Sequence, residues 1–347
     1  MRQLCPFGTH RVLEPLGVLP QAAKRLDNEM TCFDNEMLID VTTLNVDSAS
    51  FTQIKQVCNA DIERMKTMIL DIVQTRGKLQ NPVTGSGGML LGTIAKIGKD
   101  FRTTLKVGDE IATLVSLSLT PLLIKQITKI HLTKDQVDIV GQAILFQTGI
   151  YAKIPADLDR HLVLSALDVA GAPAQVKRLV KPGDTVLIIG AAGKSGMLCA
   201  YQAKMNATQT GRVIGVVNDP LQLPDLISLG VVDDIIIGDA TNSLFIYNEV
   251  MRLTNHRKVD VTVNVVNVPN TEMASILPTR DHGIVYFFGM ATSFQKAALG
   301  AEGVASEATL MIGNGYTTGH AELTLNLLRE SKTLHEIFMR RYGPKGV

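Results

Sequence analysis

The stretch "VLIIGAAGKSG" (residues 186–196) constrains the fold of this 347-residue chain more than any other segment. A short apolar run ends in a loop with glycines at 190, 193 and 196, and a helical pattern follows. Nucleotide-binding proteins hold phosphates at such strand–loop–helix junctions, because the free backbone N–H groups of the helix start face the loop. The stretch therefore predicts a nucleotide site, and the spacing of its glycines decides which kind.

The "GKS" at residues 193–195 suggests the loop that binds ATP or GTP. That loop requires GxxxxGK[ST], with a glycine five residues before the second glycine. Counting back five residues from Gly193 reaches Ile188, which lies inside the apolar run. The spacing therefore argues against an ATP-type loop. It favours a variant of the dinucleotide fingerprint GxGxxG, with the first gap one residue wider.

In a dinucleotide loop, Gly190 would allow the tight turn, Gly193 the approach of the pyrophosphate, and Gly196 the close packing of the helix. Lys194 either contacts a phosphate or is a solvated lysine at a helix start, and both alternatives stay open. The residues expected to hold the cofactor here are Gly190, Ala192, Gly193, Lys194, Ser195 and Gly196.

From about residue 162, short apolar segments alternate with helical patterns. Apolar strands separated by helices are typical of a parallel sheet buried on both faces, which predicts a Rossmann-type doubly wound α/β fold. Ligands of such sheets bind outside the carboxyl ends of the strands. Asn267 and Gly289, which end the fourth and fifth predicted strands, are therefore expected cofactor contacts.

The end of the second predicted strand bears on the choice between NAD and NADP. NAD-binding sheets usually place an acidic residue there to bind the ribose hydroxyls. Asn218 and Asp219 stand at or just after this position, and no arginine follows to hold a 2′-phosphate. The sequence predicts NAD, with Asn218 or Asp219 on the ribose and NADP as the alternative.

The first part of the chain is predicted to be rich in β-strands. Strands are predicted over residues 36–46, 87–98 and 109–119, separated by turn residues, with a helix over 61–74. The change of pattern predicts three parts: a β-rich domain over 1–157, a dinucleotide-binding domain over 158–330, and a C-terminal tail over 331–347 whose packing stays open.

Composition excludes several classes of function. The 34 basic residues balance 33 acidic ones, which argues against a nucleic-acid partner. No apolar run is long enough for a membrane span, and the N-terminus lacks the apolar core of a signal peptide. The four cysteines are far apart and form no CxxC pair, so neither a disulfide framework nor a zinc knuckle is predicted. Reduced thiols indicate a cytoplasmic protein.

Two segments carry a resemblance to a known superfamily. "GGMLLGTIAKIG" with "KVGDEIATL", followed by "KPGDTVLIIGAAGKSG", resembles the medium-chain dehydrogenase/reductase superfamily. The resemblance implies a GroES-like β-rich catalytic domain before the Rossmann domain. Zinc-dependent members carry His and Glu where this chain has Gly88 and Met89, and a cysteine ligand where it has Asp47. We therefore predict no metal, because three protein ligands for a catalytic zinc cannot be assembled.

A narrower resemblance extends over most of the chain. "CPFGTHRVLEPLGVLPQAAKRLDN" and "NPVTGSGGMLLGTI" are similar to the L-erythro-3,5-diaminohexanoate dehydrogenase family of bacterial lysine fermentation. That resemblance implies NAD(P)-dependent oxidative deamination of a diamino acid to 5-amino-3-oxohexanoate and ammonia. Two alternatives stay open: a zinc-independent ketone, enoyl or quinone reductase of the same superfamily, and a non-catalytic nucleotide-binding protein on this fold.

Four residues are candidates for the chemistry. Asp47 would bind a substrate ammonium or act as base, or it caps a helix before "SASFTQI". Asp168, the one charge in an apolar run, would be a base with a raised pKa, or a partly buried helix residue. His10 and Arg11 would supply a neutral base and a carboxylate clamp, or belong to a surface segment.

Three further features have weaker support from the sequence. Ser86 lies in the glycine-rich "TGSGG", which permits close approach of a ligand or is a plain turn. Tyr316 and His320 either reach the cleft or lie in a terminal loop. Residues 309–312 are predicted as a strand at a sheet edge, which would pair across a homodimer.

Overall fold

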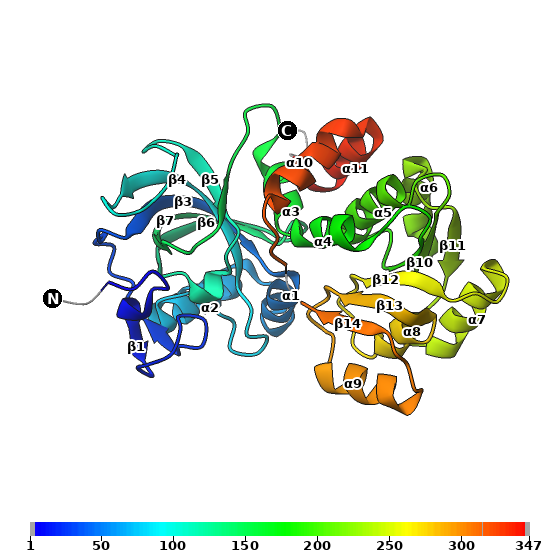
Figure 1. Ribbon diagram of the computed structural model, residues 1–347. Helices are drawn as coiled ribbons and strands as arrows, with labels where there is room; N and C mark the ends of the chain where they lie inside the picture. The colour runs from blue at the N-terminus through cyan, green and yellow to red at the C-terminus, as the bar shows by residue number, and fades with distance from the viewer. Residues whose placement is uncertain (1–3, 314, 344–347) are drawn as a thin grey trace. The chain divides into compact units, whose positions relative to one another are not determined.

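The computed structural model describes residues 4–313 and 315–343. The chain forms two compact units, Met1–Asp168 and Val169–Val347 (Figure 1). Each unit has its own sheet and its own core. No helix of the described residues is long and apolar enough to cross a membrane.

The N-terminal unit is built on an antiparallel sheet in the order β6-β7-β3-β4-β5-β8. A short ladder of β1 and β2 stands beside it as a second sheet. The strands are β1 (Val12–Glu14), β2 (Arg25–Leu26), β3 (Glu36–Val46), β4 (Gly88–Ile97), β5 (Glu110–Thr113), β6 (Leu122–His131), β7 (Gln136–Phe146) and β8 (Tyr151–Lys153). The helices are η1 (Thr9–Arg11), α1 (Ser48–Val57), α2 (Ile62–Arg76), η2 (Leu117–Leu119) and α3 (Arg160–Leu167).

The strands expected over 36–46 and 87–98 are confirmed as β3 and β4, and the expected helix is confirmed as α2. The strand expected over 109–119 is shorter, because the chain leaves the sheet after β5 and forms the single turn η2. The long β6–β7 hairpin was not predicted from the sequence. In β6 only every third or so residue is buried, so the strand lacks the alternation by which a half-buried strand is recognised.

Helices α1 and α2 cover one face of this sheet and close its core. Phe51 and Ile54 of α1 and Met65 and Ile69 of α2 are almost fully buried and pack in one cluster with Leu44 of β3. Burying each such side chain contributes about 1.5–3 kcal/mol of transfer free energy. The core therefore fixes the end of β3 and the start of α1, where Asp47 stands.

The C-terminal unit contains a six-stranded parallel sheet in the order β11-β10-β9-β12-β13-β14. This is the order of the dinucleotide-binding fold, in which the strand order reverses between the neighbouring parallel strands β9 and β12. The predicted Rossmann architecture is confirmed. The strands are β9 (Thr185–Ile189), β10 (Arg212–Val217), β11 (Asp234–Ile237), β12 (Val259–Asn264), β13 (Thr279–Phe287) and β14 (Thr309–Ile312).

Alternation along β9 explains why this sheet needs helices on both faces. Val186 and Ile188 pack in a cluster with α4, α5 and α6, whereas Leu187 and Ile189 pack with α7 and α8. All four side chains are fully buried. The helices of the unit are α4 (Gly171–Leu179), α5 (Lys194–Ala207), η3 (Pro220–Gln222), α6 (Leu223–Leu229), α7 (Ser243–Leu253), α8 (Glu272–Ile276), α9 (Phe294–Gly303), α10 (His320–Glu330) and α11 (Lys332–Tyr342).

Two segments lie near the expected domain borders, and their contacts show to which unit each belongs. Helix α3 belongs to the N-terminal unit, because Arg160 pairs with Glu110 at 3.0 Å and His161 bonds to Gln136 of β7. The expected tail, whose packing the sequence left open, contains α11, which follows α10 within the C-terminal unit (Figure 1). Helix α11 packs against α10 and α6.

Lys78, which follows α2, is a fully buried cation. Its Nζ donates to the carbonyl oxygens of Pro20 at 2.7 Å and Gln21 at 3.3 Å. Burial, with a smaller contribution from the charge of Arg76, lowers the pKa of Lys78 to about 8. In the unfolded chain the pKa returns to near 10.5, so the unfolded state binds more protons above pH 8.

This difference predicts a pH dependence of stability. Because the unfolded state binds the extra proton, the Lys78 contribution to the free energy of unfolding rises with pH between about 8 and 10. Relative to Lys78→Met, the wild type should gain about 2 kcal/mol between pH 7 and pH 10. Urea unfolding of both proteins at each pH measures this, and a constant difference would contradict the assignment.

Candidate functional site

The loop after β9 has the geometry of a dinucleotide loop. Gly190 has φ of +89°, a left-handed conformation that favours glycine. The N–H groups of Gly190 and Ala191 both donate to the carbonyl of Val216 at 3.0 Å, which ties the loop to β10. The N–H of Gly193 donates to the carbonyl of Gly190 at 3.0 Å, and α5 begins immediately afterwards.

The glycines at 193 and 196 serve different purposes. A Cβ on Gly196 would lie 2.0 Å from the carbonyl oxygen of Gly190, so a side chain there would separate the helix from the loop. A Cβ on Gly193 would lie 3.3 Å from the same oxygen. The first N–H groups of a helix have no partner within it, and the first turn of α5 contains no acidic residue. The loop therefore fits a pyrophosphate.

Asn218 and Asp219 follow directly on the last residue of β10. Asn218 is exposed, and Asp219 accepts a hydrogen bond on Oδ1 from the N–H of Leu221 at 2.9 Å, which caps η3. Beyond β12, Asn267 is exposed. After β13, Gly289 lies so close to Val266 that a Cβ would be 2.1 Å from its carbonyl oxygen. In a parallel sheet these strand ends share one edge, where the cofactor loop also lies.

Asp47 is the N-cap of α1 and also takes part in a hydroxyl cluster. Its Oδ1 accepts from the N–H of Ala49 at 3.0 Å and from Ser86 Oγ at 3.1 Å. Ser50 Oγ lies 2.6 Å from both Ser86 Oγ and Thr84 Oγ1. Ser50 is buried and Thr84 is exposed. A chain of exchangeable hydroxyl protons thus leads from the Asp47 carboxylate toward the surface of the unit.

His161, which was not a candidate from the sequence, is held by the side chain of Gln136, which is in turn held by Asn45. Its Nδ1 lies 3.0 Å from Gln136 Oε1, and Gln136 Nε2 donates to Asn45 Oδ1 at 3.2 Å. With the Gln136 oxygen as acceptor, the hydrogen-bond network assigns the proton of the neutral imidazole to Nδ1, which leaves Nε2 as an acceptor. No bonded partner of Nε2 is found among residues 4–313 and 315–343.

The surroundings of His161 keep the imidazole neutral. Burial lowers its pKa, and the charge of Lys134 adds to this effect, while Asp159 and Asp138 act in the opposite direction. Asn45 stands opposite Gln136 in the β3–β7 ladder, two residues before Asp47. A neutral imidazole with an available lone pair and a carboxylate therefore border the same end of β3. The signal that could have identified His161 is a histidine beside the helix cap Asp159, but only the fold brings Gln136 to it.

His10 and Arg11 are part of a buried ion cluster around Glu36. Arg11 Nε and Nη2 donate to the Glu36 carboxylate at 2.8 and 2.7 Å, and its remaining N–H groups donate to backbone carbonyls. His10 Nε2 lies 2.8 Å from Glu36 Oε1, and Nδ1 accepts from the N–H of Cys5. Burial alone would raise the pKa of Glu36, but the hydrogen bonds from Arg11 and His10 outweigh it and lower the pKa.

All five N–H donors of Arg11 are engaged, which leaves none for a substrate carboxylate. Arg11 is fully buried, in contrast to the surface segment considered from the sequence. We therefore assign Arg11 and His10 to the fold of the N-terminal unit rather than to the site.

The remaining candidates are Asp168, Tyr316 and His320. Asp168 is the C-cap of α3 and is half-buried, with its N–H donating to the carbonyl of Leu164 at 3.1 Å. Its role as a base stays a prediction. Tyr316 and His320 stack edge-to-face, with ring centroids 5.3 Å apart, at the start of α10. Burial lowers the pKa of His320.

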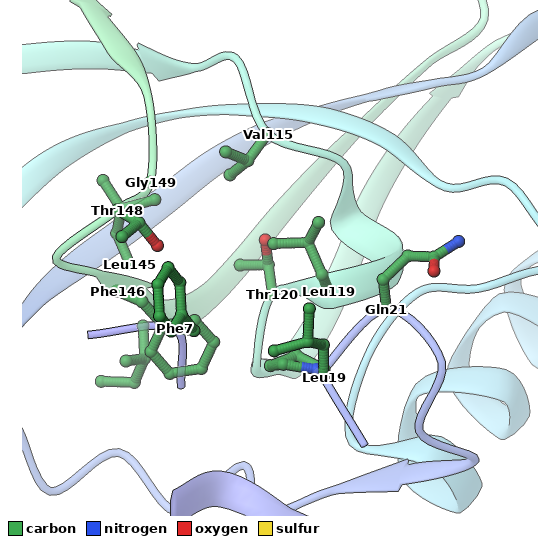
Figure 2. A pocket seen from close by; sticks show the side chains of 12 residues that line it. Phe7, Leu19, Gln21, Val115, Leu119, Thr120, Leu145, Phe146, Thr148 and Gly149 are labelled. Carbon is green, nitrogen blue, oxygen red and sulfur yellow. The ribbon is translucent and has the colours of Figure 1, made fainter. Parts of the chain in front are cut away.

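An apolar pocket of about 200 Å³ opens in the N-terminal unit. Figure 2 shows Phe7, Leu19, Leu119 and Phe146 around it, with the polar ends of Thr148 and Gln21 among them. A carboxylate or ammonium would lose its hydration there without gaining a charged partner. The pocket is therefore unsuited to a charged amino acid. Within residues 4–313 and 315–343, no three His, Cys, Asp or Glu side chains form a group that could hold a metal ion.

Comparison with known proteins places the chain in a family. The profile of the L-erythro-3,5-diaminohexanoate dehydrogenase N-terminal domain matches residues 10–155. The L-erythro-3,5-diaminohexanoate dehydrogenase of Acetoanaerobium sticklandii is 57% identical over 340 residues, 97% of this chain and 99% of that enzyme. The enzyme of the same name from Fusobacterium nucleatum is 56% identical over 99% of this chain and its own full length.

The chain belongs to the L-erythro-3,5-diaminohexanoate dehydrogenase family. The family resemblance found in the sequence is thus confirmed, and a dehydrogenase of this family requires a nicotinamide cofactor, which the glycine loop fits. Among solved structures, the Escherichia coli quinone oxidoreductase complexed with NADPH covers 91% of this chain and 83% of its own, with a TM-score of 0.55 and 15% identity. That likeness shows that the chain shares the fold of this quinone oxidoreductase.

The Glu36 cluster gives a prediction that separates the two roles considered for Arg11. Arg11→Ala leaves a buried carboxylate without its main partner, which should lower the free energy of unfolding by about 3–5 kcal/mol. Urea unfolding measures this loss. A variant of wild-type stability whose only defect is a raised KM for the amino acid substrate would restore the clamp role.

Proposed function

We propose that the protein catalyses the NAD-dependent oxidative deamination of L-erythro-3,5-diaminohexanoate to 5-amino-3-oxohexanoate and ammonia. The observation that carries this proposal is the identity of 56–57% with two enzymes of that name over nearly the whole chain. In the balanced reaction, the amino acid, NAD⁺ and water give the keto acid, ammonium, NADH and a proton. When bound, the nicotinamide accepts the hydride from C3 of the substrate.

The protein must supply two proton-active groups for this reaction. One group removes a proton from the C3 ammonium, so that the nitrogen lone pair can assist the loss of hydride. Later, a base must take a proton from the water that adds to the substrate iminium. The substrate also carries a second ammonium, which needs a carboxylate or several oxygen acceptors.

We assign the base to His161 and the ammonium-binding group to Asp47. The neutral imidazole, oriented by Gln136 and Asn45, has Nε2 as a proton acceptor. The Asp47 carboxylate stands at the same strand end, and the hydroxyls of Ser86 and Ser50 can carry protons away from it. Asp168, on the same helix as His161, is kept as a second candidate base.

NAD is the proposed cofactor, with NADP as the alternative. The residues that would hold it are Ala192 and the glycine loop, Lys194 and Ser195 at the start of α5, Asn218 and Asp219 after β10, and Asn267 and Gly289. A carboxylate after β10 favours ribose hydroxyls and repels a 2′-phosphate. We further propose a homodimer through β14, which ends the strand order and pairs with β13 on one side.

The decisive experiment is an absorbance assay of NADH or NADPH formation with L-erythro-3,5-diaminohexanoate. Simple alcohols, and quinones with reduced cofactor, serve as control substrates. Turnover of the diamino acid alone, faster with NAD than with NADP, is the expected result. Turnover of quinones without turnover of the diamino acid would overturn the proposal in favour of a reductase. Cofactor binding with no turnover of any substrate would favour a non-catalytic protein.

His161→Asn should lower kcat/KM by about 100-fold or more, the usual contribution of a general base. Because burial lowers the pKa of His161, the wild-type rate should fall only as the pH drops below about 6.5, and the variant should lose this acid limb. His282→Asn is the matched control, since His282 is exposed and has the left-handed φ that asparagine tolerates. An unchanged pH–rate profile in His161→Asn would move the base to Asp168.

Asp47→Asn keeps the helix cap of α1, because the amide oxygen can still accept from Ala49. Removing the charge should raise the KM for the diamino acid by about tenfold, the loss of one charge-assisted hydrogen bond. Steady-state kinetics measure the KM, with Asp61→Asn, which replaces the N-cap of α2, as control. Equal KM values for wild type and Asp47→Asn would exclude Asp47 from substrate binding.

A further inference from the structure

The last turn of α11 contacts the cofactor loop. Arg341 Nη1 donates to the carbonyl oxygen of Ala192 at 2.8 Å, between the glycines at 190 and 193. The same guanidinium donates from Nε to Asp225 Oδ2 at 2.8 Å. Helix α11 comes from the segment that the sequence could not place, so this contact joins residues about 150 positions apart.

Asp225, the second partner of Arg341, shows which parts of the fold the guanidinium connects. It stands in the first turn of α6, the helix that follows β10. Arg341 therefore links the loop before α5 to the start of α6, and these two helix starts flank the strand end where the adenosine half of a dinucleotide lies in this fold. With its planar guanidinium, arginine can hold both partners at once.

The same corner carries an excess of positive charge. Arg340 also pairs with Asp225, so two guanidinium groups share one carboxylate. Lys194, the first residue of α5, has its Nζ 5.9 Å from the centre of the Tyr342 ring. Basic residues in the last turn of a helix are favoured by the helix dipole alone. That effect would not require a hydrogen bond to Ala192, and it does not explain the direction in which Arg341 points.

We propose that Arg341 is a positioning residue of the cofactor site, which holds the glycine loop through Ala192 and brings the charge of the Arg340–Arg341 pair to the dinucleotide phosphates. The C-terminal helix is thereby a part of the nicotinamide-dinucleotide site, although it follows the last strand of the sheet. Without the arginine, the loop keeps its glycines but loses its link to α6, and the corner loses one positive charge.

The test measures cofactor binding by isothermal titration calorimetry, with NADH and NADPH as probes and no substrate present. Arg341→Gln should weaken binding of NADH by about tenfold, the effect of losing one charge-assisted contact. Lys332→Gln is the matched control. It removes one positive charge from the same helix, but Lys332 lies at the other end and pairs with Glu336. The control should bind NADH as the wild type does.

Arg341→Lys separates the charge from the geometry. Lysine keeps the positive charge but cannot hold Ala192 and Asp225 in the planar arrangement of a guanidinium. We expect its dissociation constant for NADH to lie between those of the wild type and Arg341→Gln, with little change in the thermal midpoint. Full recovery of affinity in Arg341→Lys would overturn the positioning role. If Arg341→Gln fails to fold, Arg341→Lys decides the question alone: weaker binding of NADH than by the wild type supports the positioning role, and equal binding overturns it.

The inference rests on the proposed nicotinamide cofactor, and its failure is distinguishable from failure of the proposed substrate. Wild-type binding of NADH without turnover of the diamino acid would overturn the reaction and leave the Arg341 test intact. Equal affinities of wild type and Arg341→Gln for both NADH and NADPH would overturn the role of Arg341, whatever the substrate. In turnover, Arg341→Gln should raise the KM for the cofactor and leave the KM for the diamino acid unchanged.

Discussion

The contact of Gly196 with the carbonyl of Gly190 is the constraint on which the cofactor site depends. Because nothing larger than hydrogen fits between them, α5 starts directly at the end of β9 and its free N–H groups point to the strand edge. Helices cover both faces of the parallel sheet, which leaves the carboxyl ends of its strands as the place where ligands of this fold bind. The dinucleotide site is therefore made of backbone, and side chains add only charge and position.

In the N-terminal unit, the corresponding constraint is the placement of charge in a protein interior. Glu36 and Arg11 are fully buried, and each is stabilised because the other and the nearby carbonyls satisfy its hydrogen bonds. His161 shows the opposite solution. It is only partly buried, its imidazole bonds to the neutral amide of Gln136, and its charged form is disfavoured. A histidine that must accept protons near neutral pH is better served by amides than by a carboxylate, which would stabilise the imidazolium.

The sequence predicted those features that depend on neighbours in the chain. The glycine spacing, the apolar strands of the parallel sheet and the β3, β4 and α2 segments are all local patterns, and the structure contains them. The pairing of His161 with Gln136 and the pairing of Arg341 with Ala192 could not be predicted from the sequence, because these contacts join segments that are distant in the chain. The same limit applies to Arg11: "GTHRV" gives no sign that Glu36 and the carbonyls of Glu29 and Thr31 enclose the guanidinium.

The two polar clusters of the N-terminal unit suit a substrate with two ammonium groups better than a neutral ketone or quinone. The Asp47 carboxylate supplies the negative charge that an ammonium requires, and the linked hydroxyls of Ser50, Ser86 and Thr84 can accept as well as donate hydrogen bonds. A carbonyl substrate would instead need a donor that polarises its oxygen, and the Asp47 carboxylate beside it would oppose the negative charge that develops there. His161, with its proton on Nδ1 and its lone pair on Nε2, also accepts. An arrangement of acceptors at the end of β3 thus favours removal of protons from nitrogen, the first step of amine oxidation.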